Sequence, residues 1–143
     1  MSILPTETSS TEETLAVGER LADRLGPGDV VALYGDLGTG KTHLVKGIAR
    51  GLGIPARDVS SPTFVIVREY DSTPPLYHFD AYRVQQVAEF YELGYEEYFY
   101  GKGICCVEWA DRVQPLIPDT ALHLHLSHEG GDRRRIRVRN ENN

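Results

Sequence analysis

The sequence predicts a three-layer α/β domain whose mixed sheet has a parallel centre and antiparallel hairpins. Three observations predict this fold. A glycine-rich segment at residues 35–42 follows an apolar run and precedes an amphipathic stretch, which is typical of a strand-to-helix turn. Two pairs of strand-like segments are joined by connections too short for parallel crossovers. The 143 residues, 41% of them hydrophobic, suffice for one globular core, so we expect a single domain over residues 1–143.

The first element is a predicted helix over residues 11–25. Ser10 and Glu13 form a capping-box pattern at its start. The apolar residues that follow have helical spacing up to Gly26-Pro27-Gly28, a combination that ends helices.

The next elements are a strand, a helix and a hairpin. The apolar run at 30–34 predicts a strand that enters the glycine-rich segment, and an apolar stripe after that segment predicts a helix ending near Gly53. Segments 63–70 and 76–82 are strand-like. Their short connection, 71–75, makes them an antiparallel hairpin.

The C-terminal half contains a helical region, a buried strand and a second hairpin. Residues 85–98 have a helical pattern with a break at Gly94. The apolar run within 103–109 is typical of an interior parallel strand. Alternating apolar and polar residues over 122–138, interrupted by the turn at 129–132, predict a hairpin with one buried face.

Residues 35–42 read Gly-Asp-Leu-Gly-Thr-Gly-Lys-Thr and match the phosphate-binding pattern G-x-x-x-x-G-K-[ST]. Its glycines let successive N–H groups point into one concavity, and the helix N-terminus adds partial positive charge. We therefore expect a P-loop NTPase-like domain that binds a polyphosphate with Mg²⁺. Lys41 would reach the β- and γ-phosphates, and the Thr42 hydroxyl would lie on the metal. The alternative is a glycine-rich turn without a ligand. The expected nucleotide-binding residues of this loop are Leu37, Gly38, Thr39, Gly40, Lys41 and Thr42.

Two acidic residues interrupt or end apolar strands and are candidates for the same site. Glu108 ends the buried run 104–107, where an NTPase places the acid that holds Mg²⁺ or its waters. Asp80 is the second candidate, with pairing to Arg83 as the alternative. Arg83 either adds positive charge near the transition state or is an ordinary surface arginine.

Three other groups have both a functional and an ordinary interpretation. The segment 60–64, rich in hydroxyls and stiffened by Pro62, is either a loop that responds to the γ-phosphate or a strand entry. His123 and His125, with His128, either hold a metal or, as we favour, are solvated on a hairpin face. The run Arg133-Arg134-Arg135 is a solvated strand end unless one guanidinium reaches a nucleotide.

Composition excludes several functional classes. A formal net charge of −6 argues against a basic surface that binds DNA or RNA directly, so RNA would be met through a partner. No apolar stretch is long enough to span a membrane and no signal peptide is visible, so we expect a cytoplasmic protein. Cys105 and Cys106 are adjacent and are expected to be buried, reduced thiols. Residues 1–10 and 140–143 are expected to be flexible tails.

Several motifs, taken together and in this order, resemble the TsaE (YjeE) family, the small bacterial P-loop ATPases of threonylcarbamoyladenosine tRNA modification. The resemblance covers roughly residues 11 to 138. The phosphate loop alone is widespread, but the ordered set is specific to this family. Its motifs are Thr14-Leu15 with Gly18-Glu19, the loop at 33–42, Ser61-Pro62-Thr63-Phe64, His78-Phe79-Asp80-Ala81-Tyr82-Arg83 and Val107-Glu108-Trp109. Similar proteins usually carry Thr at His43 and Leu at Ala81, and neither departure removes a group that the chemistry needs.

The resemblance implies ATP hydrolysis that drives a cycle with TsaB- and TsaD-like partners, which meet the tRNA. The TsaD-like subunit transfers the threonylcarbamoyl group to the adenosine beside the anticodon of tRNAs that read codons beginning with A. Residues matching Thr42 and Glu108 hold Mg²⁺, and the residue matching Asp80 lies near the γ-phosphate. With Lys41, the two acids are the expected catalytic residues. A residue near Thr11 and an arginine beginning the last strand, here Arg134, approach the nucleotide.

Two other functions stay open at this level. A small-molecule kinase shares the phosphate loop and the size, although we find no basic lid segment for a second substrate. A nucleotide-gated binding module would use ATP occupancy alone and would not require hydrolysis.

Overall fold

The computed structural model describes residues 4–36, 38–60 and 66–138, and in them a seven-stranded mixed sheet forms the middle layer. The strand order is β1-β7-β6-β2-β5-β4-β3. The four central strands are parallel, and the pairs β1–β7, β6–β7 and β3–β4 are antiparallel. The predicted fold class is therefore confirmed. The strands are β1 (Thr6–Thr8), β2 (Val30–Tyr34), β3 (Val67–Tyr70), β4 (Leu76–Asp80), β5 (Ile104–Glu108), β6 (Leu122–His128) and β7 (Arg134–Val138).

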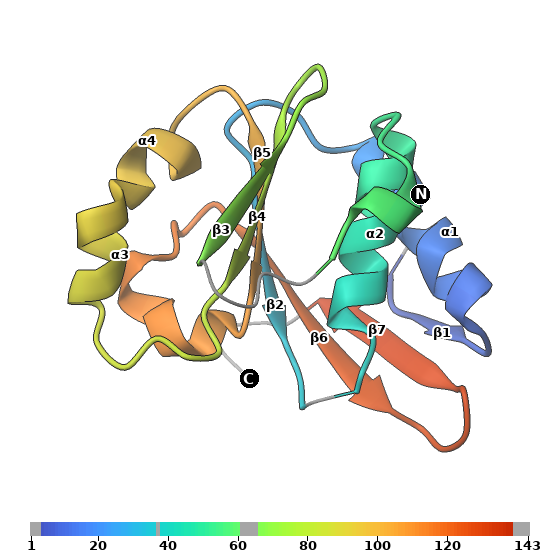
Figure 1. The fold of residues 1–143 in the computed structure, drawn as a ribbon. Coiled ribbons are helices and arrows are strands. Elements are labelled where there is room, and N and C mark those ends of the chain that lie inside the picture. Colours follow the sequence, from blue (N-terminus) through green and yellow to red (C-terminus); the bar gives the residue numbers. More distant parts are fainter. Residues whose placement is uncertain (1–3, 37, 61–65, 139–143) are drawn as a thin grey trace.

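Helices cover both faces of the sheet (Figure 1). One face packs against the first two α-helices through a core that includes Leu33, Leu44 and Leu124. The other face packs against α3, α4 and η2 through a core that includes Phe79 and Phe90. Such two-sided cover explains why β2 and β5 are apolar throughout. The helices are α1 (Thr11–Ala22), α2 (Lys41–Gly51), α3 (Ala88–Leu93) and α4 (Tyr95–Phe99), with the 3₁₀ segments η1 (Ala56–Asp58) and η2 (Ala110–Leu116).

The two helices on the first face approach each other at a glycine. A Cβ placed on Gly47 of α2 would lie 2.3 Å from the carbonyl oxygen of Leu15 in α1. No side chain fits at that separation, so glycine permits the close packing of the two backbones. Because α2 begins at Lys41, this contact also fixes the helix that carries the phosphate loop.

Helix α1 ends earlier than predicted. The Ser10 hydroxyl accepts the Glu13 N–H at 3.1 Å, as a capping box requires, although the Glu13 carboxylate accepts from Ser9. The predicted end at residue 25 is wrong. The N–H groups of Arg24 and Leu25 bond three residues back, a 3₁₀ geometry that tightens and ends the helix after Ala22.

The N-terminal segment differs from the expected flexible tail. Residues 6–8 form β1, which pairs antiparallel with β7, so that Thr8 lies opposite Arg134. The buried Thr8 hydroxyl is also 2.8 Å from that of Thr14. Without β1, the outer edge of β7 would present unpaired N–H and C=O groups, and residues 6–8 form hydrogen bonds with them. Three residues are too few to show the alternating pattern from which a strand is predicted.

The first hairpin is confirmed, with shorter strands than predicted. Strand β4 ends at Asp80 instead of residue 82, because the Asp80 carboxylate accepts the Tyr82 N–H at 2.9 Å and turns the backbone. Its partner β3 begins at Val67. Residues 63–65 of the predicted strand lie outside the described residues.

Most of the other predictions for the C-terminal half are confirmed, although the helical region predicted from residue 85 begins at Ala88. Gly94 has φ of +74° and separates α3 from α4. Strand β5 is interior and parallel to both neighbours, and both cysteines are buried and unpaired with each other. Across the described residues, no helix has the length and apolar character needed to cross a membrane.

The solvated position expected for the strand histidines is wrong for His123. This side chain is buried, and its Nδ1 lies 2.8 Å from the Tyr34 hydroxyl, which also donates to Gln114 of η2. The reason is that β6 is an interior strand, so η2 covers the face that would be open in an isolated hairpin. Within the described part of the chain, no group of three or more His, Cys, Asp or Glu side chains is placed to hold a metal, so the alternative of a histidine metal site is not supported.

Candidate phosphate and metal site

A cavity of about 390 Å³ lies at the carboxyl ends of the central parallel strands. Ligands of open α/β sheets bind at this edge, where the strands end and loops begin. The residues that line it are Gly38, Thr39, Gly40, Lys41, Thr42, His43, Asp80, Tyr82, Glu108, Trp109 and Arg134.

The loop before α2 depends on two glycines. Gly35 has φ of +144°, and a Cβ there would lie 2.5 Å from the Leu126 carbonyl oxygen. Gly40 has φ of +99° and directly precedes α2. Only glycine adopts these conformations without strain, and the result is a concave turn whose N–H groups begin a helix. Arg134, at the start of β7, lies against this turn with its Cγ 4.0 Å from the Cβ that Gly40 lacks.

Lys41 lies in the middle of the site. Its ammonium donates to the carbonyls of Gly35 at 2.5 Å and Asp36 at 2.8 Å, and it lies 4.1 Å from the centre of the Trp109 ring. Burial lowers the pKa of Lys41, and the nearby carboxylates of Glu108, Asp36, Asp111 and Asp80 oppose this change. A desolvated ammonium above an aromatic face forms strong contacts with anions.

Thr42 and Glu108 meet across the cavity. The Thr42 hydroxyl is 3.0 Å from one carboxylate oxygen of Glu108 and 2.9 Å from the other. Glu108 is only 3% exposed although it ends a strand, because α2 covers it. The second oxygen, Oε2, also lies 2.5 Å from Nε2 of the fully buried His78. A hydroxyl and a carboxylate side by side are the hard oxygen donors that Mg²⁺ prefers.

Two aromatic residues border the acids. Trp109 follows Glu108 with φ of +58°, a left-handed conformation that is unfavourable for a bulky side chain by about 1–3 kcal/mol. This turn sets the Trp109 ring over Lys41 and 4.8 Å from the Tyr82 ring. Asp80 pairs with Glu108 in the parallel register of β4 and β5, so both acids lie at the same level of the sheet edge.

His43 adds a titratable group at the rim of the cavity. Burial lowers the pKa of His43, and the positive charges of Lys46 and Arg134 lower it further, while Glu108 acts in the opposite direction. The imidazole is thus held mainly neutral near pH 7, and it leaves the cationic character of the site to Lys41 and Arg134.

The donor set fits a nucleotide with Mg²⁺. The glycine turn offers backbone N–H groups to phosphates, and Lys41 offers its ammonium. The Thr42 hydroxyl and the Glu108 carboxylate offer oxygen ligands for Mg²⁺ in the same cavity. The remaining ligands of Mg²⁺ are commonly waters and phosphate oxygens, so two protein oxygens are enough.

Comparison with known proteins agrees with this geometry. The family model described as "Threonylcarbamoyl adenosine biosynthesis protein TsaE" matches residues 8–136. The chain belongs to the TsaE family. The resemblance drawn from the sequence motifs is thereby confirmed.

Individual TsaE relatives cover most of the chain. The Bacillus subtilis protein named tRNA threonylcarbamoyladenosine biosynthesis protein TsaE is 46% identical over 137 residues, which is 95% of this chain and 85% of the relative. The protein of the same name from Treponema pallidum is 38% identical over 82% of this chain and 86% of its own length. Among solved structures, Bacillus subtilis YdiB matches with a TM-score of 0.78 and 41% identity, covering 94% of this chain and 83% of that chain.

The fold brings most of the residues predicted for a TsaE-like site to one cavity. Eight of them line it: Gly38, Thr39, Gly40, Lys41, Thr42, Asp80, Glu108 and Arg134. Thr11 does not. It begins α1 and is exposed. Arg83 is exposed as well and is not among the lining residues. Leu37 and the switch motif at 61–64 lie outside the described residues.

Sequence reasoning assigned no contact in this TsaE site to Trp109, Tyr82 or His78, although all three lie in the family motifs. The first two line the cavity, and His78 contacts Glu108 from behind it. The signal available for His78 was its position two residues before Asp80, on the same face of an apolar strand. A polar residue on a buried face needs a partner, and the nearest strand supplies Glu108.

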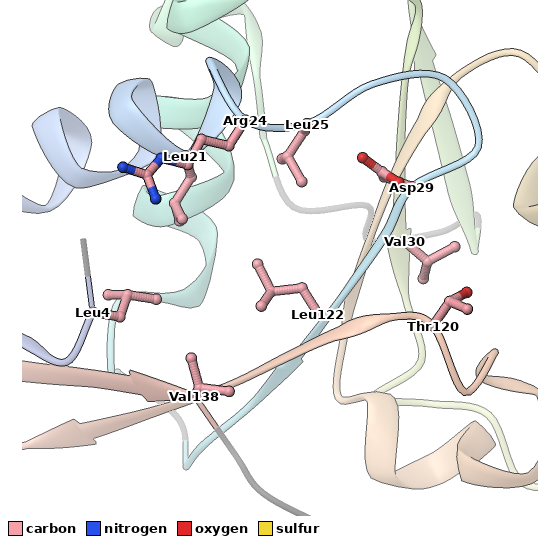
Figure 2. A pocket seen from close by; sticks show the side chains of 9 residues that line it. All are labelled: Leu4, Leu21, Arg24, Leu25, Asp29, Val30, Thr120, Leu122 and Val138. Carbon is pink, nitrogen blue, oxygen red and sulfur yellow. The ribbon is translucent and has the colours of Figure 1, made fainter. Parts of the chain in front are cut away.

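A second cavity, of about 350 Å³, lies at the opposite end of the sheet. Figure 2 shows apolar side chains gathered there from α1 and three strands, among them Leu21, Leu122 and Val138. Arg24 and Asp29 are its charged residues. It faces the amino ends of β2 and β6, away from the phosphate loop, so it is not part of the TsaE phosphate site.

Proposed function

We propose that this chain is an Mg²⁺-dependent ATPase that acts in formation of the threonylcarbamoyl modification of tRNA. The observation that carries the proposal is the convergence of four separate segments on one cavity: the phosphate loop, the ends of β4 and β5, and the start of β7. Family membership supports the pathway, since the family and the relatives are named for threonylcarbamoyladenosine biosynthesis.

Phosphate binding is assigned to the loop and two cations. The backbone N–H groups of the turn at 38–42 hold the phosphate oxygens at the start of α2. Lys41 donates to the terminal phosphates, exchanging its present carbonyl contacts for anionic ones. Arg134 lies on the other side of the turn and adds a guanidinium to the same region.

Thr42 and Glu108 would hold Mg²⁺, directly or through its waters. A metal held there would supply positive charge that offsets the charge developing on the phosphates. Asp80 lies beside Glu108 in register and lines the same cavity, which supports a role for it in orienting the attacking water. Lys41, Asp80 and Glu108 are thus the proposed catalytic residues.

Hydrolysis is proposed to reset a complex with TsaB- and TsaD-like proteins, in the cytoplasm. The tRNA would be met through those partners, in keeping with the net charge of −6 on this chain. We expect slow turnover by the isolated chain and faster turnover in the complex, because partner contacts are a common means of completing NTPase sites.

The test is release of inorganic phosphate from ATP with Mg²⁺, by the chain alone and with its partners and tRNA. We expect weak activity that rises with partners and is lost in Lys41→Ala and Glu108→Ala. Lys102→Ala, which removes an exposed lysine outside the cavity, is the matched control and should keep full activity.

Three outcomes would contradict the proposal. Nucleotide binding reported by Trp109 fluorescence, with no phosphate release under any condition, would favour a nucleotide-gated binding module. Labelled γ-phosphate found on a metabolite, and not as free phosphate, would instead favour a kinase. Unchanged tRNA modification with Lys41→Ala would remove the nucleotide from the function altogether.

A further inference from the structure

His78 is a fully buried polar residue behind the proposed metal site. It lies on β4, and its side chain points toward the face of the sheet that α2 covers. Its Nε2 is 2.5 Å from Oε2 of Glu108. The Glu108 carboxylate also accepts a hydrogen bond from the Thr42 hydroxyl of α2. The carboxylate is thus held between two strands and a helix.

The contact requires a proton on Nε2. An ionised carboxylate accepts hydrogen bonds and donates none, so the short contact is an Nε2–H donating to Oε2. The other ring nitrogen, Nδ1, is buried and has no hydrogen-bond partner among the residues that the structure describes. The hydrogen-bonding proton therefore lies on Nε2, and His78 acts on Glu108 through this atom.

We infer that His78 is a positioning residue that fixes the orientation of the Glu108 carboxylate for the metal. Oε2 is engaged by both His78 and Thr42, whereas Oε1 lies 3.0 Å from the Thr42 hydroxyl. Holding one oxygen in place aims the other at the cavity, so less rearrangement accompanies metal binding.

This inference rests on the proposed function in one respect: that the bound metal is Mg²⁺. The test compares His78→Leu, which removes the donor but keeps an apolar side chain, with His78→Gln, which offers an N–H at a similar reach. His123→Leu is the matched control, because it also replaces a buried histidine on a strand, away from Glu108.

The main readout is affinity for a nonhydrolysable ATP analogue, measured by Trp109 fluorescence with Mg²⁺ and with a chelator in its place. His78→Leu is expected to weaken the Mg²⁺-dependent part by about 10–100-fold. Affinity without Mg²⁺ should change by less than about twofold, since the phosphate loop is untouched. His78→Gln should restore most of the loss, and His123→Leu should leave the Mg²⁺ dependence intact.

The inference is overturned if His78→Leu keeps the wild-type Mg²⁺ dependence. It is also overturned if both affinities fall together with the melting temperature, or if His78→Gln folds and does not restore metal binding. A wild-type chain that binds Mg²⁺–nucleotide without hydrolysing it would contradict the ATPase proposal and leave the variant comparison valid.

A spectroscopic measurement needs neither metal nor a folded variant at position 78. Nitrogen NMR of the histidine rings in the wild-type chain should show His78 protonated on Nε2, with a proton resonance that moves in Glu108→Gln. A His78 Nε2 without a proton, or a His78 signal that does not respond to Glu108→Gln, would overturn the inference.

Discussion

The hydroxyl of Thr42 lies 2.9 and 3.0 Å from the two carboxylate oxygens of Glu108, joining the first turn of α2 to the end of β5. The two residues are 66 positions apart in the chain. Their contact brings the phosphate loop and an acidic strand end into one site, and the first prediction concerns this pair.

Replacing Thr42 should change the metal dependence of the protein more than its stability. Thr42→Val removes the hydroxyl, and we expect the Mg²⁺ concentration for half-maximal ATP turnover to rise by roughly tenfold or more. Thr42→Ser keeps the hydroxyl and should stay close to wild type. A Mg²⁺ titration of phosphate release checks this, and equal behaviour of the two variants would remove Thr42 from the metal site.

The lowered pKa of Lys41 predicts an alkaline limit to nucleotide binding. Burial makes the ammonium lose its proton at a lower pH than a free lysine, whose pKa is about 10.4. Affinity for ATP without Mg²⁺ should therefore fall as pH rises, beginning below that value, because the neutral amine attracts phosphate weakly. In Lys41→Arg the side chain stays charged over the whole pH range. Its affinity for ATP, even if lower, should therefore not fall at alkaline pH. Identical profiles for the two proteins would contradict this account.

Gly47 is predicted to be a stability determinant of the helix layer. A Cβ at this position would lie 2.3 Å from the Leu15 carbonyl oxygen, so Gly47→Ala forces α1 and α2 apart. We expect a loss of about 1–3 kcal/mol in the free energy of unfolding, in spite of the better helix propensity of alanine. Gly26→Ala is the control, because a Cβ there would meet nothing within 4 Å. Urea denaturation measures both, and equal midpoints would show that the helices can shift at no cost.

The two cysteines are predicted to be unreactive in the folded protein. Burial raises the pKa of the Cys105 thiol to about 12 and raises that of Cys106 as well. Thiol reagents attack the thiolate, which is then scarce at pH 8 and also shielded from solvent. A chromogenic disulfide reagent should report close to no reaction in native buffer and two thiols after unfolding in urea. Rapid reaction of the native chain would show that β5 is exposed by local opening.

Much of the fold could be predicted from the sequence because its signals are local. The pattern of residues 35–42 identifies a turn between a strand and a helix wherever it occurs, and the apolar run at 104–107 requires cover on both faces. Gly94 marks the break between α3 and α4 because φ of +74° favours glycine. The segment at residues 6–8, by contrast, is a strand only because β7 offers it an open edge.

The candidate site was predictable as a set of residue types at strand ends, and the tertiary structure decided which of them meet. Asp80 and Glu108 lie side by side only because β4 and β5 pair in the register that sets them opposite. A shift of one residue would turn one acid to the other face of the sheet. The same register puts His78 behind Glu108, and a left-handed turn at Trp109 brings an indole over Lys41. The phosphate loop, the acids available and the order of the α-helices and of strands β2 to β7 follow from the sequence alone, since these depend on neighbouring residues. The contacts among distant side chains depend on strand register and helix packing, which only the folded chain fixes.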